Sequence, residues 1–142
     1  MFAGFFEKEY KKVGFEDVQI AIKDTQEYII INTLPVTEQE CLIKSTTAYH
    51  LEEQLVNSLL HQYNALTELI FIVYGRNGTD ETALSKCKQL SHLGFKNVYI
   101  YIGGLFEWLL LQDIYGADEF PTTKKVLDIL AFKPKKQLFQ KR

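Results

Sequence analysis

The stretch that decides the fold reads LIFIVY at residues 69–74 and GRNGTDE at residues 75–81. The first six residues are apolar without interruption, which predicts a strand buried on both faces. Gly75 ends this strand, and apolar residues at helical spacing predict a helix over Glu81–Leu93, which Gly94 ends. A buried strand, a short glycine-containing loop and a helix together indicate a parallel α/β sheet.

The rest of the chain repeats this alternation of strands and helices. Continuous apolar runs predict buried strands at Tyr28–Ile31 and Asn97–Ile102, and strict alternation predicts a half-buried strand at Val18–Ile22. Helical spacing predicts a helix at His50–Tyr63, and a stretch that is apolar nearly all round predicts a helix covered on most sides at Leu105–Ile114. Crossover helices between strands predict a doubly wound α/β fold, in which chemistry gathers at the carboxyl ends of the strands. The loop after Tyr74 is therefore the first candidate site.

Length and composition predict one soluble domain. The chain has 142 residues, of which 46% are hydrophobic and 24% charged, and no apolar run reaches the ~20 residues of a membrane span. The N-terminus carries no secretory signal, and two cysteines make no disulfide framework, so we expect a cytoplasmic protein. We expect residues 1–120 to form the domain and residues 121–142 to be a basic segment, partly helical or flexible.

The charge distribution argues against nucleic acid as a ligand. Residues 121–142 contain seven basic residues and one acidic residue, a net charge of +6, so residues 1–120 carry −8 of the total of −2. A large acidic body does not favour nucleic-acid binding, and a solvated tail is the simpler interpretation of the lysines. Phe2, Phe5, Phe6 and Tyr10 share one helical face, which predicts an N-terminal helix folded back on the domain rather than a membrane contact.

The loop at residues 75–81 has a geometry that suits chemistry with anions. Successive backbone N–H groups beside a helix N-terminus can stabilise an anion or a thiolate. An enzyme of this kind would place a cysteine at the start of the loop, where the amides lower the pKa of its thiol. A nucleotide-binding loop is not favoured, because Gly75-x-x-Gly78 lacks the complete glycine motifs and the P-loop lysine.

At this loop and on both sides of it, the sequence resembles the rhodanese-like domains. The matching segments are the following: Ile72–Gly78 with the active-site loop, Leu90–Phe95 and Asn97–Tyr99 after it, Gly103–Trp108 with the Gly-Gly-x-x-x-Trp ending, Ile30–Thr33 with the early Ile-Asp-x-Arg strand, and Leu42–Thr46 with the His-Ile-Pro-Gly-Ala turn. The resemblance extends over roughly Val18 to Tyr115. It implies a rhodanese-like fold, with a roughly five-stranded parallel sheet and helices on both faces.

The sequence departs from this family at the positions that carry its chemistry. Gly75 stands where the family's persulfide-carrying cysteine is expected, and Asp80 stands where an active sulfurtransferase has a basic residue. The early strand has Asn32 and Leu34 at the family's Asp and Arg positions. Because glycine has no nucleophilic atom and Asp80 adds negative charge, we predict that catalysis has been lost.

Neither cysteine is expected to replace the missing nucleophile. Cys87 lies on the apolar stripe of its helix and is expected in the core, and Cys41 is expected at the edge of the core. His50, His61 and His92 are scattered, with no ligand spacing, so we expect no metal and no cofactor.

The sequence therefore predicts a catalytically inactive rhodanese-like domain that acts as a binding or regulatory module. Its candidate binding residues, the vestigial active-site loop, are Gly75, Arg76, Asn77, Gly78, Thr79 and Asp80. We expect Arg76 and Asn77 to be exposed and to contact a protein partner, whose identity the sequence does not give. Two alternatives stay open: an enzyme that uses a non-standard cysteine such as Cys41, and a structural or assembly protein, with a homodimer through the Trp108 helix.

Overall fold

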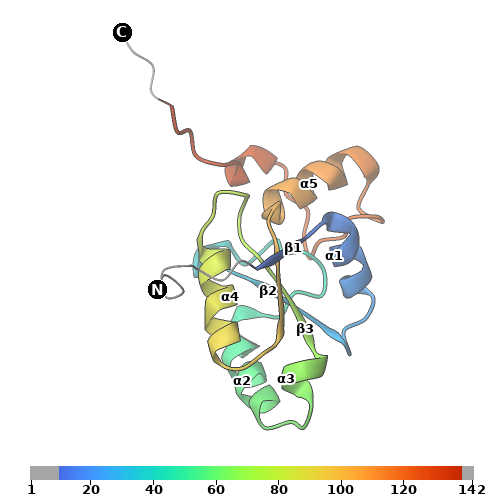
Figure 1. Ribbon diagram of the computed structural model, residues 1–142. Coiled ribbons are helices and arrows are strands. Elements are labelled where there is room, and N and C mark those ends of the chain that lie inside the picture. The colour runs from blue at the N-terminus through green and yellow to red at the C-terminus, as the bar shows by residue number, and fades with distance from the viewer. Residues whose placement is uncertain (1–9, 139–142) are drawn as a thin grey trace.

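The described residues, 10–138 of a computed structural model, form a parallel sheet with helices on both faces (Figure 1). The sheet has four strands, β1 (Lys11–Val13), β2 (Tyr28–Asn32), β3 (Ile70–Tyr74) and β4 (Asn97–Tyr101), in the order β1-β4-β3-β2. Every pairing is parallel, and β3 lies between β2 and β4. The α/β class and the parallel sheet predicted from the sequence are thus confirmed.

Successive side chains along each strand point to opposite faces of the sheet, so there are two hydrophobic cores, one on each face. On one face, Ile30, Ile72 and Tyr74 pack against α1 (Phe15–Ile22) and α5 (Gly104–Tyr115). On the other, Ile31, Phe71 and Val73 pack against three helices, which are α2 (Tyr49–Leu60), α3 (Ala65–Glu68) and α4 (Thr82–His92). Strands that are apolar on both faces are stable only when both faces are covered, which is why β2 and β3 read as continuous apolar runs.

The predicted strand at Val18–Ile22 is wrong, because these residues belong to helix α1. The backbone N–H of Gly14 donates to the Asp17 carboxylate at 3.1 Å, and this contact caps the helix at its start. Val18 and Ala21, three residues apart, are fully buried, whereas Ile20 is 56% exposed. The buried face thus follows the helical period and not the strand period.

The four strands of residues 10–138 are close to the roughly five that were predicted, and the sheet differs from the prediction at its two edges. Beside β2, the position of a further strand is reduced to one parallel bridge between Ile30 and Thr46. At the other edge, β1 starts directly after Tyr10, where we predicted a helix. The other residues of that predicted helix, Phe2, Phe5 and Phe6, lie outside the described residues.

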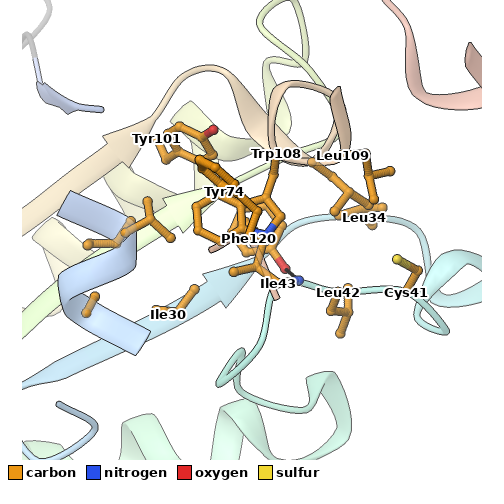
Figure 2. Close-up of a cluster of buried hydrophobic side chains, with 14 residues drawn as sticks. Ile30, Leu34, Cys41, Leu42, Ile43, Tyr74, Tyr101, Trp108, Leu109 and Phe120 are labelled. Carbon is orange, nitrogen blue, oxygen red and sulfur yellow. Dashed lines mark hydrogen bonds between the residues drawn. The ribbon is translucent and has the colours of Figure 1, made fainter. Parts of the chain in front are cut away.

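The chain after α5 closes one of the two cores. Figure 2 shows Tyr74, Trp108 and Phe120 clustered between the sheet and α5. The Trp108 and Phe120 rings meet edge to face at 5.0 Å, and Trp108 Nε1 donates to the Pro121 carbonyl at 3.1 Å. Thr122 then forms an antiparallel bridge with Ile43. A final 3₁₀ turn, η3 (Ile129–Phe132), packs beside α5.

Candidate functional site

The β3–α4 loop lies at the carboxyl edge of the sheet, directly against the first turn of α5. Leu105 N donates to the Gly75 carbonyl at 3.0 Å, and Phe106 N donates to the Arg76 carbonyl at 2.9 Å. Gly104 has a φ of +67°, and a Cβ there would lie 2.8 Å from the Gly75 carbonyl oxygen and 2.9 Å from Asn77 N. Only glycine allows this approach, which holds the loop on the end of α5.

Asp80 folds back under the loop, and its carboxylate binds the loop's own donors. Oδ2 accepts a hydrogen bond from Arg76 N at 2.9 Å. Oδ1 accepts from Thr82 N at 3.0 Å and from Thr82 Oγ1 at 2.6 Å, at the start of α4. Partial burial raises the pKa of the Asp80 carboxyl, but these hydrogen bonds and the Arg76 charge outweigh it and hold that pKa below its ordinary value of 3.8. Asp80 is therefore a negatively charged carboxylate that is bound by the loop itself.

This carboxylate fills the space into which a side chain at position 75 would project. A Cβ on Gly75 would lie 2.7 Å from Asp80 Oδ2, 3.0 Å from Asp80 Cγ and 3.1 Å from Thr33 Oγ1. Thr33, at the end of β2, is held there by a 2.8 Å hydrogen bond between its hydroxyl and that of Thr82. The loop is thus closed around a glycine, and a larger residue at its start requires the Asp80 carboxylate to move.

Arg76 and Asn77 do not lie at an exposed tip, and that expectation is wrong. Asn77 is only 8% exposed, and its Nδ2 donates to the Phe132 carbonyl at 2.9 Å. Arg76 Nη2 donates to the Ala131 carbonyl at 2.8 Å, and its guanidinium lies 5.6 Å from the centre of the Phe132 ring. Arg76 also pairs with Glu38 at 3.3 Å. The two side chains are covered because the C-terminal segment returns over the loop.

The loop and this returning segment form the two walls of a groove of about 740 Å³. Its lining residues are Thr33, Pro35, Arg76, Asn77, Thr79, Asp80, Glu81, Thr82, Leu130, Ala131, Lys133, Lys135 and Gln137. Of the predicted site, Arg76, Asn77, Thr79 and Asp80 line the groove, Gly78 is exposed beside them, and Gly75 is buried beneath. The opposite wall could not be predicted from the sequence, because no local pattern shows where a basic tail returns.

The two cysteines are buried and are not among the groove-lining residues. Figure 2 shows Cys41 at the edge of the core around Trp108, and its Sγ donates to the Lys124 carbonyl at 3.1 Å. Burial raises the pKa of Cys41, and it raises the pKa of Cys87, within α4, to about 12. Near neutral pH both sulfurs are therefore protonated thiols, which are weak nucleophiles.

Asn32 has a structural role at the end of β2. Its Oδ1 accepts hydrogen bonds from Leu34 N at 3.0 Å and from Gln39 Nε2 at 2.8 Å, and its Nδ2 donates to Gln39 Oε1 at 3.0 Å. The side chain is 4% exposed, and Leu34 is buried in the core. These contacts shape the turn after β2 rather than present a reactive group.

Residues 10–138 contain neither a candidate metal site nor a candidate membrane span. No cluster of three or more histidine, cysteine, aspartate or glutamate side chains in this range could hold a metal ion. No helix in the same range is long and apolar enough to cross a membrane.

The parallel sheet, the β3–α4 loop and the glycine contact with α5 define a protein class, and a comparison of sequences names it. The family model of the rhodanese-like domain matches residues 9–111, which is more than half of the chain. The protein therefore belongs to the rhodanese-like domain family. No curated protein matches the sequence.

Solved structures agree on this fold. The chain is 19% identical to the BH2092 protein of Bacillus halodurans, with a TM-score of 0.56 over 75% of this chain and 74% of the other. It is 18% identical to the Alr3790 protein of Anabaena sp., with a TM-score of 0.54 over 84% and 86%. It is 16% identical to Ygr203w, a yeast protein tyrosine phosphatase of the rhodanese family, with a TM-score of 0.54 over 82% and 94%. At these identities the likeness concerns the fold alone.

Proposed function

We propose that this protein is a catalytically inactive rhodanese-like domain that serves as a binding or regulatory module. The observation that carries the proposal is the Asp80 carboxylate, whose Oδ2 lies 2.7 Å from the position of a Cβ at residue 75. We align Gly75 with the family's cysteine, so an oxygen that cannot transfer a sulfur atom lies against the position from which the reactive side chain would project.

The electrostatics of the loop support the same proposal. A thiosulfate or phosphate ion in the loop would need backbone N–H donors, but those of Arg76 and Thr82 already donate to Asp80. An entering anion would also approach a carboxylate whose pKa is lowered and which is ionised near neutral pH. Substrate anions are therefore opposed both by occupied donors and by like charge.

The alternative of an enzyme that uses Cys41 has less support. Cys-dependent transfer requires a thiolate near the substrate, and burial raises the pKa of Cys41 while its Sγ donates to the Lys124 carbonyl. Assembly through the Trp108 helix stays a prediction in which Trp108 itself takes no part, because it is fully buried. The outward residues Leu110, Ile114 and Tyr115 are 39–69% exposed.

Sulfur transfer to cyanide, with thiosulfate or mercaptopyruvate as donor, tests the proposal, together with hydrolysis of p-nitrophenyl phosphate. We expect no activity above background from the full-length protein. Activity that disappears in Cys41→Ser would overturn the proposal and favour the enzyme.

The variants Gly75→Cys and Gly75→Cys/Asp80→Ser separate the two changes in the loop. We expect Gly75→Cys to be inactive and destabilised by about 1–3 kcal/mol, since its Cβ meets Asp80 Oδ2 at 2.7 Å. The double variant relieves this contact but also loses the hydrogen bonds of Asp80, so its urea unfolding is compared with that of Asp80→Ser alone. We expect the cysteine to cost less stability in the Asp80→Ser background than it does beside Asp80. High activity from Gly75→Cys alone would show that Asp80 does not obstruct the site.

A further inference from the structure

Residues 129–133 lie on the β3–α4 loop in the way that a bound peptide lies on its receptor. Two successive carbonyl groups of this segment, those of Ala131 and Phe132, accept hydrogen bonds from side chains of the loop, Arg76 Nη2 at 2.8 Å and Asn77 Nδ2 at 2.9 Å. Hydrogen bonds to main-chain carbonyls recognise a backbone shape and do not depend on the side chains of the ligand.

One side chain of the segment adds a sequence requirement. The Phe132 ring lies 5.6 Å from the Arg76 guanidinium carbon, which is within the range of a cation–π contact. Phe132 and Ile129 are partly buried against the core cluster around Trp108, whereas Leu130, between them, is 61% exposed. An aromatic residue is therefore the main anchor of the segment.

The groove continues beyond Phe132 with complementary charge. Lys133 and Lys135 line one wall, and Asp80 and Glu81 line the other. A ligand in which basic residues follow the aromatic one places its positive charges toward the acidic end of the loop.

The residues that lead into this segment are packed only lightly against the rest of the protein. Thr123 is held by Leu42, whose N donates to Thr123 Oγ1 at 3.0 Å, and Val126 is partly buried against the core. Between Lys124 and Asp128, the other residues are exposed, with Leu127 at 91%. Release of residues 129–133 therefore breaks the contacts at Arg76, Asn77 and the anchor residues and leaves the sheet intact.

We infer that the surface of the β3–α4 loop that faces residues 129–133 is a peptide-binding site, and that this segment of the chain is its resident ligand. Its external ligand is a peptide that presents two successive carbonyls in a tight turn, with an aromatic residue followed by lysine or arginine. This inference rests on the proposed function, since it assigns the loop to binding. A tethered segment acts at an effective concentration of about millimolar, so it masks the site until a partner competes with it.

The test uses a fluorescently labelled peptide, VLDILAFKPKKQL, which copies residues 126–138, and the full-length protein. In Ile129→Ser/Phe132→Ala the resident segment is weakened, and we expect the peptide to bind at least about tenfold more tightly than to the unaltered protein. Leu127→Ala, at a position that is 91% exposed and lies outside both the groove and the segment 129–133, is the matched control and is expected to bind as the unaltered protein does.

Two further changes test the recognition itself. Arg76→Ala in the weakened background, and a peptide with alanine in place of its phenylalanine, are each expected to weaken binding at least about tenfold, because each removes the contact between the guanidinium and the ring. Equal binding to the weakened and unaltered proteins, or binding that Arg76→Ala leaves unchanged, would overturn the inference.

Hydrogen exchange in the unaltered protein covers the case in which the weakened variant fails to fold. Ala131 N and Lys133 N donate within the turn, to the carbonyls of Asp128 and Leu130. Excess peptide is expected to speed their exchange, and protection that stays unchanged at saturating peptide would contradict the inference. Sulfur-transfer activity would overturn the proposed function on which this inference rests, whereas failed peptide competition without such activity would overturn this inference alone.

Discussion

Asp80 shows what a single residue type can and cannot reveal about a site. The sequence predicted that its negative charge would oppose anions in the loop, on the basis of residue type and position. Its return toward Gly75 could not be predicted, because it depends on the Arg76 and Thr82 N–H groups, which the folded loop brings together. The same carboxylate therefore has a structural role that the sequence pattern alone does not show.

Asp80→Asn is expected to destabilise the protein by about 1–2 kcal/mol at pH 7, because hydrogen bonds to a charged acceptor are replaced by weaker ones. The lowered pKa of Asp80 means that its stabilisation is complete above the unfolded value, close to 3.8, and is lost as pH falls through the folded pKa. The difference between the two proteins in urea unfolding should thus shrink below pH 3.8. Asp113→Asn, at an exposed position of α5, is the control. A difference that stays constant down to pH 2 would contradict this role.

At the scale of helices and strands, continuous apolar runs and long amphipathic stretches were sufficient to predict most of the elements. The strands β2, β3 and β4 and the helices α2, α4 and α5 appear within a few residues of their predicted positions. Val18–Ile22 was misread because five alternating residues are too few to distinguish the two periods. Strand β1 was missed because Lys11–Val13 is a short edge strand with two exposed lysines, which carries almost no apolar signal.

The close contact between α5 and the β3–α4 loop depends on Gly104. Gly104→Ala is expected to cost about 2–4 kcal/mol, because its φ is +67° and the new Cβ would meet the Gly75 carbonyl at 2.8 Å. Chemical denaturation measures the loss, with Gly78→Ala as the control, since a Cβ at Gly78 makes only an ordinary 3.5 Å contact, with the Ile102 carbonyl oxygen. Equal stability of the two variants would mean that the loop is not held against α5 as described.

For the whole molecule, the fold extends past the family match. That match ends at residue 111, yet Phe120 is buried and Pro121 receives the Trp108 hydrogen bond. Residues 121–142 were predicted from their charge to be a basic segment that is partly helical or flexible. Their hydrogen bonds with the loop join residues that are 55 positions apart in the sequence. No local sequence pattern predicts such pairs.

Phe120→Ala is expected to destabilise the protein by about 3–4 kcal/mol, since it removes a buried ring that packs on Trp108 at 5.0 Å. Trp108 fluorescence follows the unfolding. Leu127→Ala, at a position 91% exposed, should change the stability by less than about 0.5 kcal/mol. A loss of under about 1 kcal/mol for Phe120→Ala would show that the chain after α5 is not part of the cooperative fold.

The carboxylate beneath Gly75 also constrains the order in which a lineage could regain catalysis. A cysteine at position 75 crowds the Asp80 carboxylate, and the loss of that carboxylate removes the hydrogen bonds that hold the loop. Either change made first therefore costs stability without giving a working site, so selection for activity could not favour it. Relatives that carry a glycine and an aspartate at these two positions are therefore expected to retain both.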